Sequence, residues 1–160
     1  MRALLPLLLL AACSGKPTRG ASGSPDLEAA AIRAGLIADP KSADITGLYA
    51  RDTDRLCIVR AGNGYRAGAF VDYGDDLNCS AQGPVARAGE TLSFSFAPDC
   101  QIDARFEGDR IVFPGRVPEG CARRCTRRAS LAALDVERLS DSPAEAATLR
   151  DGKGKLLCGG

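Results

Sequence analysis

The stretch Thr91–Phe106, TLSFSFAPDCQIDARF, decides the fold. In both of its halves apolar and polar residues alternate one by one, and the second half sets Cys100, Ile102, Ala104 and Phe106 between polar neighbours. Successive side chains of a β-strand point to opposite faces of the sheet. The alternation therefore predicts two antiparallel strands with one apolar face.

Turn-forming residues divide the surrounding region, from about Ile45 to Pro114, into short segments of this kind. Asn63-Gly64 is a preferred dipeptide of two-residue type I′ hairpins, and Gly108-Asp109 also suits a two-residue turn. The turn-favouring residues glycine, proline and aspartate predict further turns at Asp75-Asp76, Gly83-Pro84, Ala88-Gly89 and Pro98-Asp99. This spacing predicts seven or eight strands that follow one another up and down.

The aromatic residues locate the hydrophobic core. The chain has five phenylalanines and three tyrosines, and all lie between Tyr49 and Phe113. A meander with one apolar face buries that face by closing into a small barrel or by lying under helices. The predicted fold class is therefore mainly β, an antiparallel up-and-down meander, with the small barrel and the helix-covered sheet both left open.

A helix is predicted before the first strand. The segment Ser24–Pro40, SPDLEAAAIRAGLIADP, opens with an N-cap serine and a proline at the first helical position. Asp39-Pro40 is expected to end the helix. Its apolar residues recur at helical spacing, and we expect this face to pack on the protein's own domain rather than on a membrane or partner: Leu27, Ala30, Ala31, Ala34 and Ile37.

The segment after the strands is predicted to be helical and to return to the sheet. Ser142-Pro143-Ala144-Glu145 has the form of a capping box and predicts a helix that runs to about Arg150. Ser130–Leu139 is predicted to be another helix. Leu156-Leu157-Cys158 is expected to return to the body of the domain, held there by a disulfide.

The apolar run Ala3–Ala12 indicates where the protein resides. Its ten residues, 3 to 12, are fewer than the roughly 20 that a membrane-spanning helix needs, and Pro6 would break a core helix. The segment has the layout of a secretory signal peptide, with one positive residue followed by leucines and then by small residues. Leu10-Ala11-Ala12-Cys13 at its end resembles the lipobox of bacterial lipoproteins at all four positions.

This resemblance implies that Cys13 carries a diacylglyceryl group and becomes the acylated amino terminus once residues 1–12 are removed. The residue after it is Ser14, and the absence of an aspartate there implies the outer membrane, facing the periplasm. Residues 13–24 then form the lipidated cysteine and a flexible tether of small polar residues. Residues 25–160 are expected to form a single globular domain braced by disulfides.

The cysteine count agrees with this interpretation independently. Seven cysteines are present, and assigning Cys13 to lipid leaves six that pair in an oxidising compartment: Cys57, Cys79, Cys100, Cys121, Cys125 and Cys158. The first three lie in the predicted sheet and the last three follow it, so at least one disulfide must join the two regions. Their connectivity stays open, although Cys57 and Cys79 would lie on strands that flank a third strand, too far apart to pair unless both lie near strand ends.

The composition argues against several kinds of chemistry. The chain has no histidine, so it offers no Ser-His-Asp triad, and a zinc site would need four thiolates. The lysines of the mature chain lie in polar or glycine-rich segments that favour no neutral amine for a Ser-Lys pair: Lys16, Lys41, Lys153 and Lys155. We therefore expect no catalytic residues, no metal, no cofactor and no enzymatic activity. The formal net charge of +1 indicates no nucleic-acid partner.

Two charged clusters remain as candidate sites. Arg123, Arg124, Arg127 and Arg128 surround Cys125, and their guanidinium groups suit a phosphate, a carboxylate or an acidic partner. Asp72, Asp75 and Asp76 surround a predicted turn and offer oxygen ligands for calcium, without the spacing of an EF-hand. A solvated surface is the simpler interpretation of the arginines, and turn capping is the simpler interpretation of the aspartates.

Three classes of function follow from these observations. The first is a non-catalytic binding module on a lipid anchor, whose partner is an envelope protein or an anionic polymer. Small disulfide-braced barrels of this kind resemble, at the level of fold, lipoprotein inhibitors of lysozyme and proteases, so an inhibitor of an envelope enzyme belongs to this class. The alternatives are a structural or assembly component of the outer membrane and a hydrolase of unrecognised type.

Overall fold

The structure is a computed structural model that describes residues 24–159, with side chains from residue 27 onward. The predicted signal peptide, the lipobox with Cys13, and the tether as far as residue 23 lie outside the described residues. The described chain is mainly β and is braced by three disulfides.

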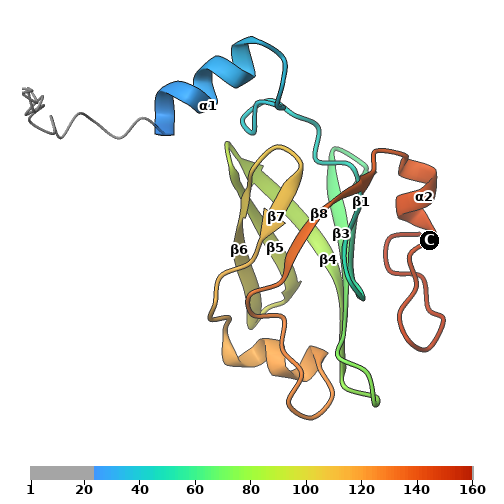
Figure 1. The fold of residues 1–160 in the computed structure, drawn as a ribbon. Coiled ribbons are helices and arrows are strands. Elements are labelled where there is room, and N and C mark those ends of the chain that lie inside the picture. The colour runs from blue at the N-terminus through green and yellow to red at the C-terminus, as the bar shows by residue number, and fades with distance from the viewer. Residues whose placement is uncertain (1–23, 160) are drawn as a thin grey trace, which may run out of the picture.

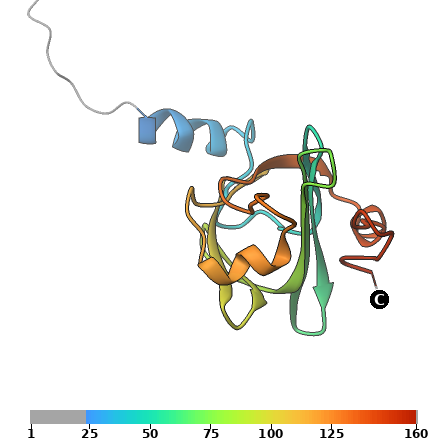
Figure 2. The same cartoon turned by 90° about the horizontal axis from the view of Figure 1, so that it is seen from below.

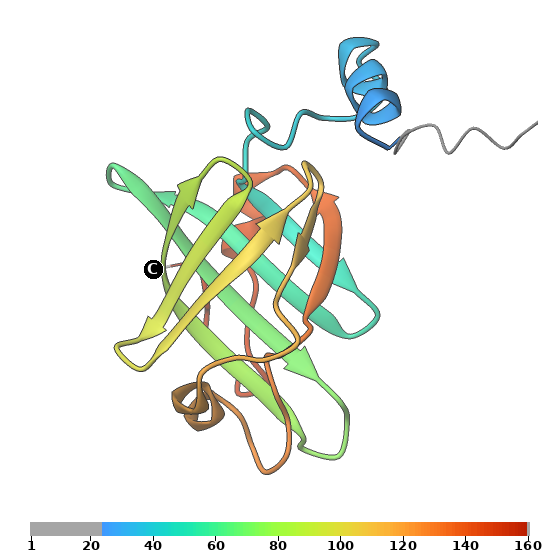
Figure 3. The same ribbon diagram turned by 90° about the vertical axis from the view of Figure 1, so that its left-hand side faces the viewer.

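Eight antiparallel strands form a closed barrel, in which each strand pairs with the next and the last pairs with the first (Figure 1). The strands are β1 (Gly47–Arg51), β2 (Asp54–Ala61), β3 (Gly64–Asp72), β4 (Asn78–Ala88), β5 (Thr91–Ala97), β6 (Cys100–Phe106), β7 (Arg110–Val112) and β8 (Asp135–Ser140). Figure 3 shows how the strands cross the barrel obliquely. The predicted up-and-down meander is confirmed, and of the two open alternatives the structure takes the barrel.

Strand β8 corrects one prediction. Ser130–Leu139 was expected to be helical, but Asp135–Ser140 forms the strand that joins β7 to β1. Val136 lies opposite Ile111 of β7, and both side chains are fully buried. Closing the barrel pairs every strand edge, and this tertiary pairing outweighs the local helical preference of the segment.

Three predicted turns also differ from the structure. The turn predicted at Ala88-Gly89 lies one residue later, at Gly89 and Glu90, since Ala88 pairs with Thr91. Gly83-Pro84 lies inside β4, where the backbone of β5 approaches so closely that a Cβ on Gly83 would lie 2.1 Å from the Ser95 carbonyl oxygen. The β2–β3 hairpin turns at Gly62 and Asn63, one residue earlier than predicted, since Ala61 pairs with Gly64. Of these two turn residues only Gly62 has a positive φ, 58°, which is the pattern of a type II′ turn rather than type I′.

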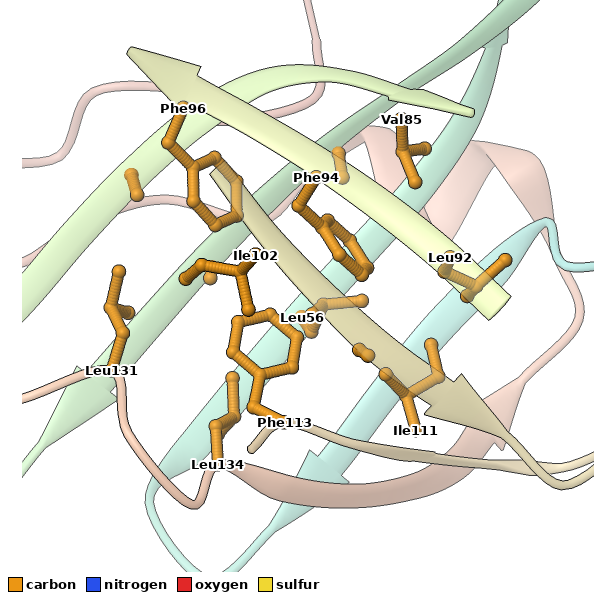
Figure 4. Close-up of a cluster of buried hydrophobic side chains, with 14 of the residues drawn as sticks. Leu56, Val85, Leu92, Phe94, Phe96, Ile102, Ile111, Phe113, Leu131 and Leu134 are labelled. Atoms are coloured by element: carbon orange, nitrogen blue, oxygen red, sulfur yellow. The ribbon is translucent and has the colours of Figure 1, made fainter. Parts of the chain in front are cut away.

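The inward-facing side chains fill the barrel, as the alternation in β5 and β6 predicts. Phe94 lies near the middle of this core, with its ring centroid 5.0 Å from that of Phe113 and 5.6 Å from that of Phe96 (Figure 4). Leu56, Ile102 and Ile111 are among the buried residues around them. An eight-stranded barrel is just wide enough to be packed in this way.

A second, smaller core lies outside the barrel. It joins Cys57, Ala146, Leu157 and Cys158, with Leu48, Val59, Phe70 and Leu149 packed against it. Here the C-terminal segment covers the outer face of β1–β3, at the side of the barrel (Figure 2). Gly68 of β3 makes this possible, because a Cβ at that position would lie 2.4 Å from the Leu157 Cβ.

The helices are shorter than predicted. Helix α2 (Pro143–Ala147) begins as expected, with the Ser142 hydroxyl accepting a hydrogen bond from the Glu145 amide at 3.3 Å. It ends before Arg150 because the chain turns back there, and the Leu157 amide donates to the Leu149 carbonyl oxygen. A 3-10 helix, η1 (Glu119–Arg124), lies across one end of the barrel (Figure 2).

Helix α1 (Ser24–Arg33) stands apart from the barrel (Figure 1). It ends before Asp39-Pro40 because the chain leaves the helix near Gly35, which has a φ of 69°. The expected packing of its apolar face on the domain is wrong in this structure, since Leu27 is 75% exposed and Ile37 is 46% exposed. The apolar inner face of the sheet is enclosed by the barrel itself and needs no helix to cover it.

Each of the three disulfides joins a barrel strand to a segment outside the strands: two reach the β7–β8 connection, and one reaches the C-terminal segment after β8. They link Cys57 to Cys158, Cys79 to Cys125, and Cys100 to Cys121. This agrees with the parity argument, which requires at least one such link, and with the expectation that Cys57 and Cys79 do not pair with each other. The bridges fix η1 and the C-terminal segment on the barrel.

Candidate functional site

A cleft of about 690 Å³ lies outside the barrel, where three separate segments meet. The β3–β4 hairpin supplies one wall, the end of η1 and the residues after it supply a second, and the loop 151–153 supplies a third. We call it the mixed-charge cleft, because its walls carry Asp72, Asp75, Asp76, Asp151, Arg123, Arg124 and Lys153.

The structure therefore brings together residues from both charged clusters of the sequence. Asp72, Asp75 and Asp76 line the cleft across from Arg123 and Arg124, although about 50 residues separate the two clusters in the chain. The other two arginines of the cluster, Arg127 and Arg128, are exposed on the following loop and do not line the cleft.

The hairpin wall is a turn fixed by its own aspartates. The Asp72 carboxylate accepts a hydrogen bond from the Gly74 amide at 2.9 Å. Gly74, Asp75 and Asp76 all have positive φ values, of 77°, 50° and 60°. Aspartate tolerates this left-handed region better than most residues, which explains the residue types of the turn. Turn capping thus accounts for Asp72, while Asp75 and Asp76 face the cleft.

Thr126 ties the hairpin wall to the arginine wall. Its hydroxyl accepts a hydrogen bond from the Asn78 amide at 2.9 Å and donates one to the Asp76 carbonyl oxygen at 2.6 Å. The neighbouring Cys79–Cys125 disulfide joins the same two segments covalently. Sequence reasoning missed Thr126, because only the pairing of these cysteines shows that its hydroxyl reaches the hairpin.

The third wall is held by Asp151. Its carboxylate accepts hydrogen bonds from the Lys153 and Lys155 amides, both at 2.9 Å, and from the Ser80 hydroxyl at 3.3 Å. Burial acts to raise the pKa of Asp151, but these hydrogen bonds outweigh it and leave the pKa below its ordinary value. Gly152 packs beside the Phe70 ring, which also lines the cleft.

Four charged side chains of the cleft have no charged or hydrogen-bonding partner within residues 27–159. Arg123 is engaged, since it forms an ion pair with Asp99. Asp75, Asp76, Arg124 and Lys153 take part in none of the ion pairs, which are defined by nitrogen–oxygen distances up to 4.0 Å. The cleft therefore presents two carboxylates and two cations to whatever enters it.

The three aspartates of the hairpin do not form a metal centre. Among the described residues, no group of three or more histidine, cysteine, aspartate or glutamate side chains is arranged to hold a metal ion. In the part of the chain that the structure describes, no helix has the length and apolar character needed to cross a bilayer.

The charges, the tying hydrogen bonds and the disulfide make the mixed-charge cleft the candidate binding site of this protein. Comparison with protein-family models, with curated proteins and with solved structures finds no match to this chain.

Proposed function

We propose that this protein is a bacterial envelope lipoprotein that acts as a non-catalytic binding module, with the mixed-charge cleft as its binding surface. The observation that carries the proposal is a set of four charges without a partner among the described residues: Asp75, Asp76, Arg124 and Lys153. Thr126 and the Cys79–Cys125 disulfide tie the arginine segment to the hairpin, and the Ser80–Asp151 hydrogen bond ties the loop 151–153 to β4. Backbone segments that are held in place before binding lose little conformational freedom when a partner arrives, and this favours recognition.

The disulfides support an exported protein. Three bridges persist in oxidising compartments and are rare in the cytosol. They use six of the seven cysteines, and Cys13 of the lipobox-like sequence is the one left over. We propose that Cys13 carries the lipid anchor and that the domain faces the periplasm from the outer membrane. More than one acyl chain makes such an anchor effectively permanent.

The anchor is tested separately from the cleft. Intact mass of the native protein is expected to show a chain that begins at Cys13 and carries acyl groups. Cys13→Ala is expected to remove the acyl groups and to move the protein from the membrane fraction to the soluble fraction. A native protein that still begins at Met1 without fatty acids would contradict the proposed location.

Binding is tested by capture from living cells. Proximity labelling from the intact lipoprotein is expected to enrich one envelope protein or polymer over an unrelated lipoprotein of the same membrane. The double variant R124E/K153E reverses the charge of two cleft residues and is expected to lose this enrichment. The control R127Q/R128Q alters two arginines of the same segment outside the cleft and is expected to keep it.

Enrichment that never exceeds that of the unrelated lipoprotein would overturn the binding module. If the enriched partner is an envelope enzyme, the purified lipoprotein is then expected to lower its activity, as an inhibitor would. If the enriched enzyme keeps its activity, the protein is not its inhibitor, and a binding module without inhibitory action remains.

A second candidate, a structural or assembly component of the outer membrane, is favoured by a different observation. Leu27, Leu36 and Ile37 are 75%, 78% and 46% exposed near the amino-terminal end of the described chain, and exposed apolar residues suit contact with a membrane or another envelope component. This candidate predicts that deletion alters the permeability of the outer membrane. An intact barrier in the deletion strain would argue against it.

A further inference from the structure

We infer that the mixed-charge cleft binds a short peptide segment that carries one cationic group and one anionic group. This inference rests on the proposed function, since it names the class of ligand for the same cleft. The charges are divided by wall: Asp75 and Asp76 lie on the β3–β4 hairpin, while Arg124 and Lys153 lie on the other two segments.

The opposite charges share one cleft without neutralising one another. No carboxylate oxygen of Asp75 or Asp76 lies within 4.0 Å of a side-chain nitrogen of Arg124, Lys153 or any other described lysine or arginine. The hairpin wall and the arginine wall are held together by the Cys79–Cys125 disulfide and by the hydrogen bonds of Thr126, and the third wall is held to β4 by the Ser80–Asp151 hydrogen bond. A ligand with both charges can pair with each wall, and no internal ion pair has to break first.

A ligand with only one sign of charge fits this cleft poorly. A polyanion would meet the four carboxylates of Asp72, Asp75, Asp76 and Asp151, and a polycation would meet Arg123, Arg124 and Lys153. Like charges held close to one another are destabilising, whereas complementary charges select the partner. The cleft therefore favours a ligand in which the two signs alternate over a short distance.

The size and lining of the cleft suit a few peptide residues. Its volume of about 690 Å³ lies inside the range of roughly 300–1,000 Å³ that is typical of small-ligand sites. The half-buried Phe70 ring offers an apolar contact for the methylene groups of a long charged side chain.

The position of the cleft favours a peptide over a zwitterionic lipid headgroup. The β3–β4 turn and η1 lie at one end of the barrel, whereas α1 and the segment that leads from it into β1 lie at the other end (Figures 1 and 3). The proposed anchor precedes α1 in the chain. The cleft thus lies at the end of the barrel opposite to the one where the chain that would carry the proposed anchor enters.

The test is a binding titration on the intact lipidated protein in detergent, followed by ligand-observed NMR. The probes are blocked peptides of the form acetyl-Lys-(Ala)n-Glu-amide, with zero to three alanines between the charges, so that several separations are sampled. The matched controls replace Lys by Glu or Glu by Lys. We expect at least one mixed peptide to bind about fivefold or more tightly than both of its like-charged analogues, the effect of about one ion pair.

Variants assign each charge to a wall. D75N/D76N is expected to abolish the preference over the dianionic analogue, because the cation of the peptide no longer has a partner. R124Q/K153Q is expected to abolish the preference over the dicationic analogue. R127Q/R128Q is expected to keep both preferences. Unchanged thermal unfolding of each variant shows that binding, not folding, was altered.

Three results would overturn the inference: like-charged peptides that bind as tightly as mixed ones, preferences that survive in both cleft variants, or no peptide binding at all. Binding to vesicles of a zwitterionic lipid that R124Q/K153Q abolishes, together with no peptide binding, would assign the cleft to a headgroup instead. A result that overturns peptide binding at the cleft can be distinguished from one that overturns the proposed binding module. Capture of an envelope partner that the cleft variants do not affect would keep the binding module and place its surface elsewhere.

Discussion

Arg110 of β7 and Asp135 of β8 form a two-point ion pair across the strands that close the barrel. The Arg110 Nε atom donates to Asp135 Oδ1 at 2.7 Å, and Nη2 donates to Oδ2 at 2.5 Å. Asp135 also pairs with Arg51 of β1 at 3.1 Å, so one carboxylate connects three adjacent strands. Because β7 spans only three residues, these side chains reinforce a seam with few backbone hydrogen bonds.

This pair predicts a pH-dependent contribution to stability. Hydrogen bonds from Arg110 hold the pKa of Asp135 below its ordinary value of 3.8, with further lowering by the charges of Arg110 and Arg51. A carboxyl group with a lowered folded-state pKa stabilises the fold fully above that ordinary value, and the contribution is lost as pH falls through the folded-state pKa. Asp135→Asn is therefore expected to lower the Tm at pH 7, by about 2–4 °C, and to lower it less at pH 3.

Thermal unfolding of wild type and variant across this pH range checks the expectation. Asp141→Asn serves as the control, because Asp141 is exposed and forms no ion pair among the described residues. A Tm difference for Asp135→Asn that stays constant from pH 7 to pH 3 would show that the charge of Asp135 is not what stabilises the seam.

Gly68 predicts how tightly the C-terminal segment is seated. A methyl group at this position would lie 2.4 Å from the Leu157 Cβ and 3.0 Å from the Cys57 Sγ, so Gly68→Ala must displace the segment. We expect a loss of about 1–3 kcal/mol in the free energy of unfolding. We also expect faster hydrogen exchange of the Leu157 amide, which donates to the Leu149 carbonyl oxygen at 2.9 Å.

Gly64→Ala is the matched control on the same strand. The atom nearest to the added methyl group would be the Ala61 carbonyl oxygen at 4.0 Å, and Gly64 has no positive φ. Its free energy of unfolding is expected to change little. Equal effects of the two substitutions would mean that loss of glycine flexibility, rather than contact with Leu157, decides the outcome.

Local patterns predicted most of the barrel but not its closure. The alternation of Thr91–Phe106 places apolar side chains on one face of a strand whatever its neighbours are, so β5 and β6 could be predicted from the sequence. Strand β8 does not, because only Val136 and Leu139 of its six residues are apolar, and Leu139 is 64% exposed. Asp135–Ser140 forms a strand because it pairs with β7 on one side and β1 on the other, and no local sequence pattern predicts this pairing.

The cleft was predictable in parts. Its acidic and basic clusters stand out in the sequence, but several connectivities were possible for the six cysteines, and only the Cys79–Cys125 bridge brings Asp76 and Arg124 to one site. The sequence around Lys153 did not indicate that this residue lines the cleft, because its position depends on how the C-terminal segment folds back. The residue types thus identified the charged clusters, but only the long-range disulfide pairing and the fold of the C-terminal segment showed that they meet in one cleft.

The three disulfides are expected to differ in their contribution to stability. Their cysteines are separated by 101, 46 and 21 residues for Cys57–Cys158, Cys79–Cys125 and Cys100–Cys121. Loop-closure entropy for each bridge as the sole cross-link predicts about 4.7, 4.0 and 3.4 kcal/mol in that order. The three loops are nested, so each contribution is smaller when the other two bridges are intact, but the order stays the same. Replacing each pair by alanines should therefore lower the Tm most for Cys57–Cys158 and least for Cys100–Cys121. The reverse order would show that local packing, not restriction of the unfolded chain, dominates.

Asp54 predicts a stabilising substitution with the opposite pH dependence to Asp135. Burial raises the pKa of Asp54 above its ordinary value, and the charges of Asp52 and Asp72 add to the rise, against hydrogen bonding from the Asp72 amide. A raised folded-state pKa means that ionisation of Asp54 opposes folding at neutral pH. Asparagine keeps the oxygen that accepts from the Asp72 amide at 3.1 Å and removes the charge.

Asp54→Asn is therefore expected to raise the free energy of unfolding at pH 7. The gain should disappear as pH falls below the pKa of the folded-state carboxyl group, where wild type is also neutral. Urea unfolding of both proteins at pH 7 and pH 3 measures this. Asp54→Ala separates the two roles of the side chain, because it removes the acceptor as well and should be less stable than Asp54→Asn at both pH values. A loss of stability for Asp54→Asn at pH 7 would show that the carboxylate charge itself holds the Asp72 amide, and that burial of Asp54 is not the dominant effect.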